Sequence, residues 1–132
     1  KAEDLLKTLP EDAGNCAMRG EISEGKGDFA TACEWFMKAI AQDQKNAQFR
    51  SDLGRNLAVR GNIRGAIEQF NKATRMAPSN GGYWFNLAVA LNSDGRAEEA
   101  IERARKALEL EPANERYKKL VQELTGLQDL SR

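Results

Sequence analysis

The sequence repeats itself with a period of 34 residues, and this period constrains the fold more than any other feature of the chain. Pro78 and Pro112 lie one period apart. Four ladders of identical residues share the same step: Gly27, Gly61 and Gly95; Ala32, Ala66 and Ala100; Ala39, Ala73 and Ala107; Asn46, Asn80 and Asn114. Four independent ladders at one period do not arise by chance, so the chain is predicted to be an array of one structural unit.

Three full units follow from this register, at 13–46, 47–80 and 81–114. Residues 1–12 are expected to be the end of a preceding repeat helix, and residues 115–132 a C-terminal capping helix and tail. The whole chain is therefore predicted to form one continuous array.

Each unit is predicted to contain two antiparallel helices. In the third unit, apolar residues recur at helical spacing in two segments: Tyr83, Trp84, Leu87, Ala88 and Leu91, then Ala97, Ala100, Ile101, Ala104, Ala107 and Leu108. The glycine ladder falls between the two segments, where a left-handed residue ends a helix. No segment has the alternation of a strand, so the fold class is all-α.

Polar residues at fixed places predict where these helices begin and end. Asp28 and Asn62 supply side-chain oxygens at the start of second helices, and the asparagine ladder does the same for the first helix of the following unit. Pro78 and Pro112 cannot continue a helical hydrogen-bond ladder, so they end the second helix of their units. The alanines at 32, 66 and 100 allow two helices to cross closely.

Composition excludes several function classes. The 132 residues carry 20 Lys plus Arg and 20 Asp plus Glu, so no net field attracts nucleic acid or an anionic membrane. The chain has no histidine, which removes the commonest general base and metal ligand. We therefore expect no enzyme activity, no cofactor, no metal site and no nucleic-acid partner.

The cysteines and the apolar runs add further limits. Cys16 and Cys33 lack the paired spacing of a zinc site and are predicted to be small core residues. The longest apolar run, Leu87 to Leu91, is five residues, so no direct membrane insertion is expected. The start of the chain shows no targeting segment, and nothing in the sequence indicates a compartment.

The units resemble the tetratricopeptide repeat. The third unit carries the pattern at Trp84, Leu87, Ala88, Leu91, Ala100, Ala104 and Pro112, and the second at Leu53, Gly54, Leu57, Ala66, Phe70 and Pro78. The first keeps Gly20, Gly27, Ala32, Phe36 and Ala39 but departs from it at Cys16, Arg19, Ser23 and Gln44. The RNA-binding pentatricopeptide family is the nearest alternative, but the proline and asparagine ladders and the zero net charge favour the tetratricopeptide interpretation.

The resemblance implies a right-handed α-solenoid of stacked antiparallel helix pairs, three full repeats plus flanking helices. First helices would line an extended concave surface of the kind that binds a peptide or a partner segment. The function expected is a protein–protein interaction scaffold or adaptor. The alternative is a structural spacer or self-assembly unit of a larger repeat protein, with self-association through the end helices.

Candidate groove residues are first-helix positions that point away from the shared core. Asn86 can satisfy both a donor and an acceptor of a bound main chain, and Arg55 can pair with a carboxylate. Phe85 and Val89 would form an apolar anchor beside Asn86, or simply complete the packing between helices. The predicted partner-binding set is Asp52, Arg55, Phe85, Asn86, Val89, Arg116 and Lys119.

One known subclass can be compared place by place. Tetratricopeptide domains that hold acidic chaperone tails use a clamp of Lys and Asn residues with an Arg. The matching places here are Ala17, Glu21, Asp52, Gly82 and Asn86, and four of the five fail. A shift by one unit gives a partial basic strip at Ser51, Arg55, Asn86, Arg116 and Leu120. A chaperone-tail clamp is therefore not expected, although Arg55, Asn86 and Arg116 leave open the recognition of an acidic peptide end.

The first helix of the first unit places polar residues toward the stack. Asn15, Arg19 and Ser23 stand where the next unit has Phe49, Leu53 and Leu57, and buried polar groups need partners. Either Arg19 pairs with an acidic group such as Glu3 or Asp4, or this junction is open and serves association with another chain.

Overall fold

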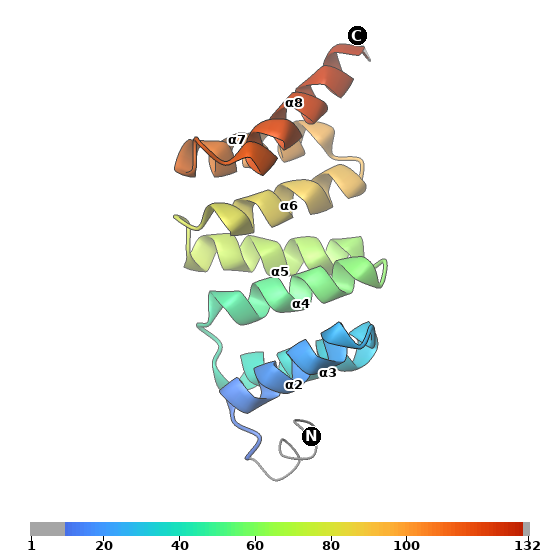
Figure 1. Ribbon diagram of the computed structural model, residues 1–132, viewed down its shortest axis with the longest axis vertical. Helices are drawn as coiled ribbons and strands as arrows, with labels where there is room; N and C mark the ends of the chain where they lie inside the picture. The colour runs from blue at the N-terminus through green and yellow to red at the C-terminus, as the bar shows by residue number, and fades with distance from the viewer. Residues whose placement is uncertain (1–9, 131–132) are drawn as a thin grey trace.

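The computed structural model describes residues 10–130, with side chains up to residue 126. Every regular element in these residues is an α-helix, in the order α2 (Ala13–Gly25), α3 (Phe29–Gln42), α4 (Ala47–Val59), α5 (Ile63–Met76), α6 (Gly81–Ser93), α7 (Ala97–Leu110) and α8 (Glu115–Leu130). Figure 1 shows them stacked along the long axis of the molecule, with α2 and α8 toward opposite ends. The all-α solenoid of paired helices is confirmed.

The helices begin and end where local chemistry requires. Asn46 and Asn80 accept from the backbone N–H groups of Phe49 and Tyr83, at 3.2 and 3.3 Å, and cap α4 and α6. Asp28 and Asn62 cap α3 and α5 in the same way. The predicted capping roles of these residues are therefore confirmed.

Glycines make the tight turn inside each pair. Gly27, Gly61 and Gly95 have φ of 80°, 86° and 78°, the left-handed region that side chains rarely adopt. The predicted left-handed helix ends are thus confirmed.

The buried core divides into two clusters that share one bridging residue. One cluster joins the second and third pairs to α8 and includes Phe70, Leu87 and Ile101. The other joins the first pair to α4 and includes Cys16, Cys33, Phe36 and Leu53. Leu57 packs against both. The core placement predicted for the two cysteines is confirmed, and both are free thiols.

The polar start of α2 is partnered within the chain. The Arg19 side chain is 12% exposed, its Nη1 lies 3.4 Å from Glu11 Oε1, and its guanidinium lies 4.8 Å from the Trp35 ring centroid. Asn15 Nδ2 donates to the Pro10 carbonyl at 2.9 Å. Residues 10–12 precede α2 without helical structure. The rest of the expected preceding helix, residues 1–9 with Glu3 and Asp4, lies outside the described residues.

Candidate functional site

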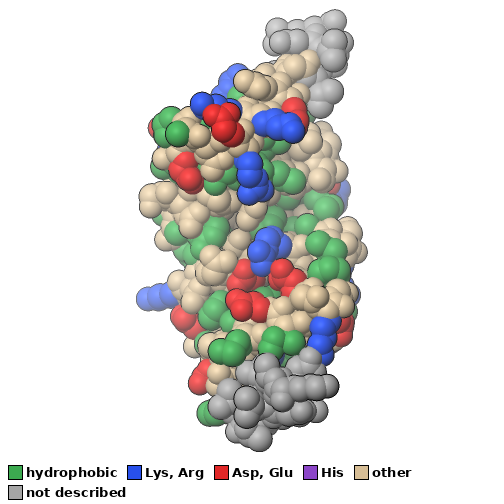
Figure 2. Space-filling model, viewed as in Figure 1, with side chains coloured by type: hydrophobic (Ala, Val, Ile, Leu, Met, Phe, Trp, Pro, Cys, Tyr) green, Lys and Arg blue, Asp and Glu red, His purple; other side chains and the backbone are tan. Residues whose placement is uncertain are grey.

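A pocket of about 410 Å³ lies on the face formed by the first helix of each pair. Its walls come mainly from α4 and α6, and its lining extends to Glu24 of α2 and Arg116 of α8. We call this face, formed by α2, α4, α6 and α8 and including the pocket, the groove. Figure 2 shows it in space-filling form, with charged and hydrophobic side chains side by side.

The pocket has an apolar wall that is open to solvent. Val59 of α4 and Val89 of α6 are 62% and 41% exposed, although most large hydrophobic side chains of a folded domain are buried. Phe70 and Phe85 also line the pocket. A concave apolar surface of this kind can shield an apolar side chain of a ligand from water.

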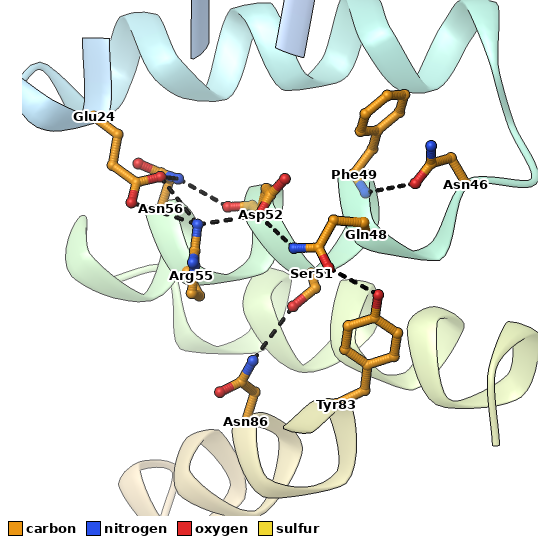
Figure 3. Close-up of polar contacts among 10 residues, drawn as sticks. All are labelled: Glu24, Asn46, Gln48, Phe49, Ser51, Asp52, Arg55, Asn56, Tyr83 and Asn86. Carbon is orange, nitrogen blue, oxygen red and sulfur yellow. Dashed lines mark hydrogen bonds and ion pairs between the residues drawn. The ribbon is translucent and has the colours of Figure 1, made fainter. Parts of the chain in front are cut away.

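The polar wall is organised around Arg55. Arg55 Nη2 lies 3.1 Å from Glu24 Oε1 and 3.1 Å from Asp52 Oδ1, so one guanidinium bridges two carboxylates (Figure 3). Gln48 Nε2 donates to the same Asp52 oxygen at 2.9 Å. The Arg55 charge is therefore engaged inside the chain, whereas the sequence predicted that Arg55 would bind a carboxylate of a partner.

Asp52 is 5% exposed and belongs to the inner layer of this wall rather than to its open surface. Burial raises the pKa of the Asp52 carboxyl, and the nearby charges of Glu21 and Glu24 raise it further. The hydrogen bond from Gln48 and the charge of Arg55 act in the opposite direction. Asp52 thus orients Arg55 from the inner layer, and its buried carboxyl group is harder to ionise than an exposed one.

Asn56 completes the network beneath the surface. Its Nδ2 donates to Glu24 Oε1 at 2.9 Å and to the Asp52 carbonyl at 2.8 Å. Its side chain is 1% exposed, and its Oδ1 accepts no hydrogen bond from the described residues. These contacts fix the position of Glu24 at the α2 edge of the pocket.

Two hydrogen bonds join α4 to α6 along the groove (Figure 3). Tyr83 Oη donates to Gln48 Oε1 at 3.0 Å, and Asn86 Nδ2 donates to Ser51 Oγ at 3.3 Å. Asn86 lines the pocket, but one of its donors is already used within the chain. Asp52 was predicted in the groove and is buried instead, and Ser51 beside it is buried as well. For Ser51 the reason is the side chain of Asn86, which reaches over it from the next pair.

The α8 end of the groove is aromatic and basic. The rings of Phe85 and Tyr117 stack with centroids 5.0 Å apart, and the Arg116 guanidinium lies 4.9 Å from the Phe85 centroid. Burial raises the pKa of Tyr117, which stays neutral. Lys119, three residues after Arg116, has a side chain 75% exposed and lies 4.0 Å from Glu123.

The structure brings most of the predicted residues to one place. Arg55, Phe85, Asn86, Val89 and Arg116 all line the pocket. Asp52 lies behind Arg55, and Lys119 lies on α8 outside the lining.

Sequence reasoning missed Glu24, Asn56 and Val59 as parts of this site. A signal existed for Asn56, because the neighbouring repeats carry Ile22 and Ala90 at its place in the 34-residue register. A polar residue in an apolar ladder indicates a special contact.

Within residues 10–130, no group of three or more acidic or cysteine side chains is placed to hold a metal ion. None of the helices in that part of the chain is long and apolar enough to cross a membrane.

Two family models, both described as "Tetratricopeptide repeat", match the sequence at residues 13–46 and 51–115. Together they span most of the chain, from α2 to α7 apart from residues 47–50 of α4. No curated protein matches the sequence.

Solved structures share the fold at low sequence identity. The first TPR of Spaghetti (RPAP3), bound to the HSP90 peptide SRMEEVD, has a TM-score of 0.85 at 19% identity, over 91% of this chain and 94% of that one. The Sgt2 TPR domain from Aspergillus fumigatus has a TM-score of 0.86 at 18% identity, over 93% and 82%. MamA has a TM-score of 0.85 at 22% identity, over 96% and 76%.

Proposed function

Because this chain belongs to the tetratricopeptide repeat family, we propose that it is a protein-interaction scaffold that binds an extended segment of a partner protein in its groove. The observation that carries the proposal is the pocket between α4 and α6, which holds exposed Val59 and Val89 beside polar side chains. A concave apolar pocket with a few polar groups is typical of a binding site.

A solved relative of the fold supports this assignment. The structure of the first TPR of Spaghetti (RPAP3) holds a peptide, and its fold superposes on this chain with a TM-score of 0.85. The proposal takes from that protein only the binding of a peptide segment. The proposal includes no catalytic step, since the sequence has no histidine and modules of this family work by binding.

The test compares two matched pairs of exposed apolar residues. Val59→Glu with Val89→Glu places charge in the pocket, and Met37→Glu with Met76→Glu places the same charge on α3 and α5. All four side chains are between 40% and 62% exposed, so neither double variant should disturb the core. Thermal unfolding of each variant checks that the fold is kept.

Proteins captured from a cell lysate by the parent and by both variants are then quantified by mass spectrometry. We expect at least one partner to be lost with the Val59 and Val89 variant and retained with the Met37 and Met76 variant. Equal recovery with all three proteins would contradict groove binding and favour the spacer or self-assembly alternative.

A further inference from the structure

We propose that the segment bound in the groove carries opposite charges at its two ends: a basic side chain toward α2, an apolar side chain at Val59 and Val89, and an acidic side chain beside Arg116 of α8. This inference rests on the proposed function and specifies the chemistry of the partner. The charges along the groove and the pocket between them support this assignment.

The α2 end of the groove is acidic after its internal pairing is taken into account. Glu24 and Asp52 share the single guanidinium of Arg55, and Glu21, exposed on α2, adds its charge close enough to affect Asp52. Two accessible carboxylates, those of Glu21 and Glu24, therefore face the one guanidinium of Arg55, which also pairs with the buried Asp52. Figure 2 shows acidic side chains gathered beside a basic one on this face.

Two further features favour a cation at this end. Arg55 already donates to both Glu24 and Asp52, so a ligand carboxylate would have to break those bonds to reach it. The Asn56 amide donates to Glu24 and holds it at the edge of the pocket, so the Glu24 carboxylate is already positioned to meet a cation. A Lys or Arg side chain of the partner would instead be attracted to this end, because it has more carboxylates than cationic side chains.

The α8 end has the opposite character. Arg116 lines the pocket and lies over the Phe85 ring, and within the described residues it forms no ion pair. Its exposed guanidinium can donate two parallel hydrogen bonds to a carboxylate. Lys119 adds a second positive charge one turn further along α8, partly offset by Glu123.

The apolar pocket lies between these two ends. Val59, Val89 and Phe85 line it, whereas Glu24 and Arg116 mark its two limits along the stack of helices. Charge complementarity therefore favours a dipolar segment over a uniformly acidic one, because an acidic residue at the α2 end would face Glu21 and Glu24. A peptide with acidic residues on both sides of its apolar residue should accordingly bind this chain weakly.

The test is a selection of random twelve-residue peptides displayed on phage against the whole chain, with the Val59→Glu and Val89→Glu double variant for counter-selection. We expect groove-dependent peptides to place a large apolar residue between a Lys or Arg on one side and an Asp or Glu on the other. The selected peptide should bind at least about tenfold more tightly in fluorescence anisotropy than the same peptide with its basic residue replaced by Glu.

Charge reversal then assigns each end of one selected peptide. Arg116→Glu should weaken its binding by about three- to tenfold, and replacing the acidic residue of the peptide by Lys should restore the affinity. Glu21→Lys should also weaken binding, and replacing the basic residue of the peptide by Glu should restore the affinity. Arg105→Glu, an exposed charge reversal on α7 outside the pocket, is the control and should leave the affinity unchanged.

The outcomes separate this inference from the proposed function. Groove-dependent peptides with no charge pattern, or with acidic residues at both ends, would overturn the inference and leave groove binding intact. A selection that yields no groove-dependent peptide would overturn both.

Discussion

Close contact between glycine and phenylalanine sets the helix separation inside the first two pairs. A Cβ placed at Gly54 would lie 2.6 Å from Phe70 Cε1, and one at Gly20 would lie 2.9 Å from Phe36 Cζ. In the third pair the corresponding residues are Ala88 and Ala104, so a larger residue on one helix coincides with a smaller one on the other. The space at the helix crossing is therefore filled in all three pairs, by a phenylalanine of the second helix in the first two pairs and by two alanines in the third.

Gly54→Ala should therefore destabilise the protein. Phe70 is buried and cannot move away without displacing its neighbours, so we expect the free energy of unfolding to fall by about 1–3 kcal/mol. Gly126→Ala in α8 is the control: nothing lies within 4 Å of its added Cβ, and alanine favours a helix by about 0.5–1 kcal/mol over glycine. Urea denaturation measures both. An unchanged free energy for Gly54→Ala would show that the two helices can separate freely.

The sequence predicted which residues line the groove better than it predicted the contacts that their side chains make there. Periodicity places Arg55 and Val89 at one register position, and both line the pocket. Periodicity gives no information on pairing between repeats, so the engagement of Arg55 by Glu24 of the preceding repeat could not be predicted. The burial of Asp52 also depends on Gln48 and Arg55, whose rotamers the register does not specify.

Whole helices were the most predictable feature of the chain, because each boundary has a local cause. Asparagine, aspartate, glycine and proline act on the residues next to them, and α5 and α7 both end two residues before their proline. The exception is α7, which follows Arg96 and has no side-chain cap hydrogen bond. Arg96 pairs instead with Glu99, with Nη2 2.7 Å from Oε2.

This difference between second helices predicts opposite effects of two substitutions. Asn62→Ala removes the 2.9 Å hydrogen bond from Gly65 N–H and should cost about 1 kcal/mol of stability. Arg96→Asn adds the missing cap to α7 and removes an exposed ion pair of little net value, so it should raise stability. Chemical denaturation at matched salt measures both. A loss of stability for Arg96→Asn as large as that for Asn62→Ala would contradict the capping argument.

For the whole molecule, stacking makes stability a property of neighbouring repeats rather than of a single core. The period of 34 was sufficient to predict this arrangement, but it could not show how unevenly the repeats contribute. The buried residues of α2 are small, namely Cys16, Ala17 and Gly20, whereas α6 buries Tyr83, Leu87 and Leu91 among others. α2 therefore buries less apolar surface than α6, and we expect the first repeat to open first, beginning at α2.

The two cysteines make this difference measurable, because both are buried in the first repeat and the chain has no others. A thiol reagent can modify them only when that repeat opens. Phe36→Ala removes a fully buried ring from the cluster that contains both cysteines. It should accelerate labelling of the cysteines at least about tenfold under native conditions. Leu87 lies in the other cluster. Leu87→Ala should lower the free energy of unfolding of the whole chain by about 2–5 kcal/mol, with much less effect on labelling of the cysteines. Equal acceleration by both variants would mean that the repeats unfold only together, because opening the first repeat would then require the third to open as well.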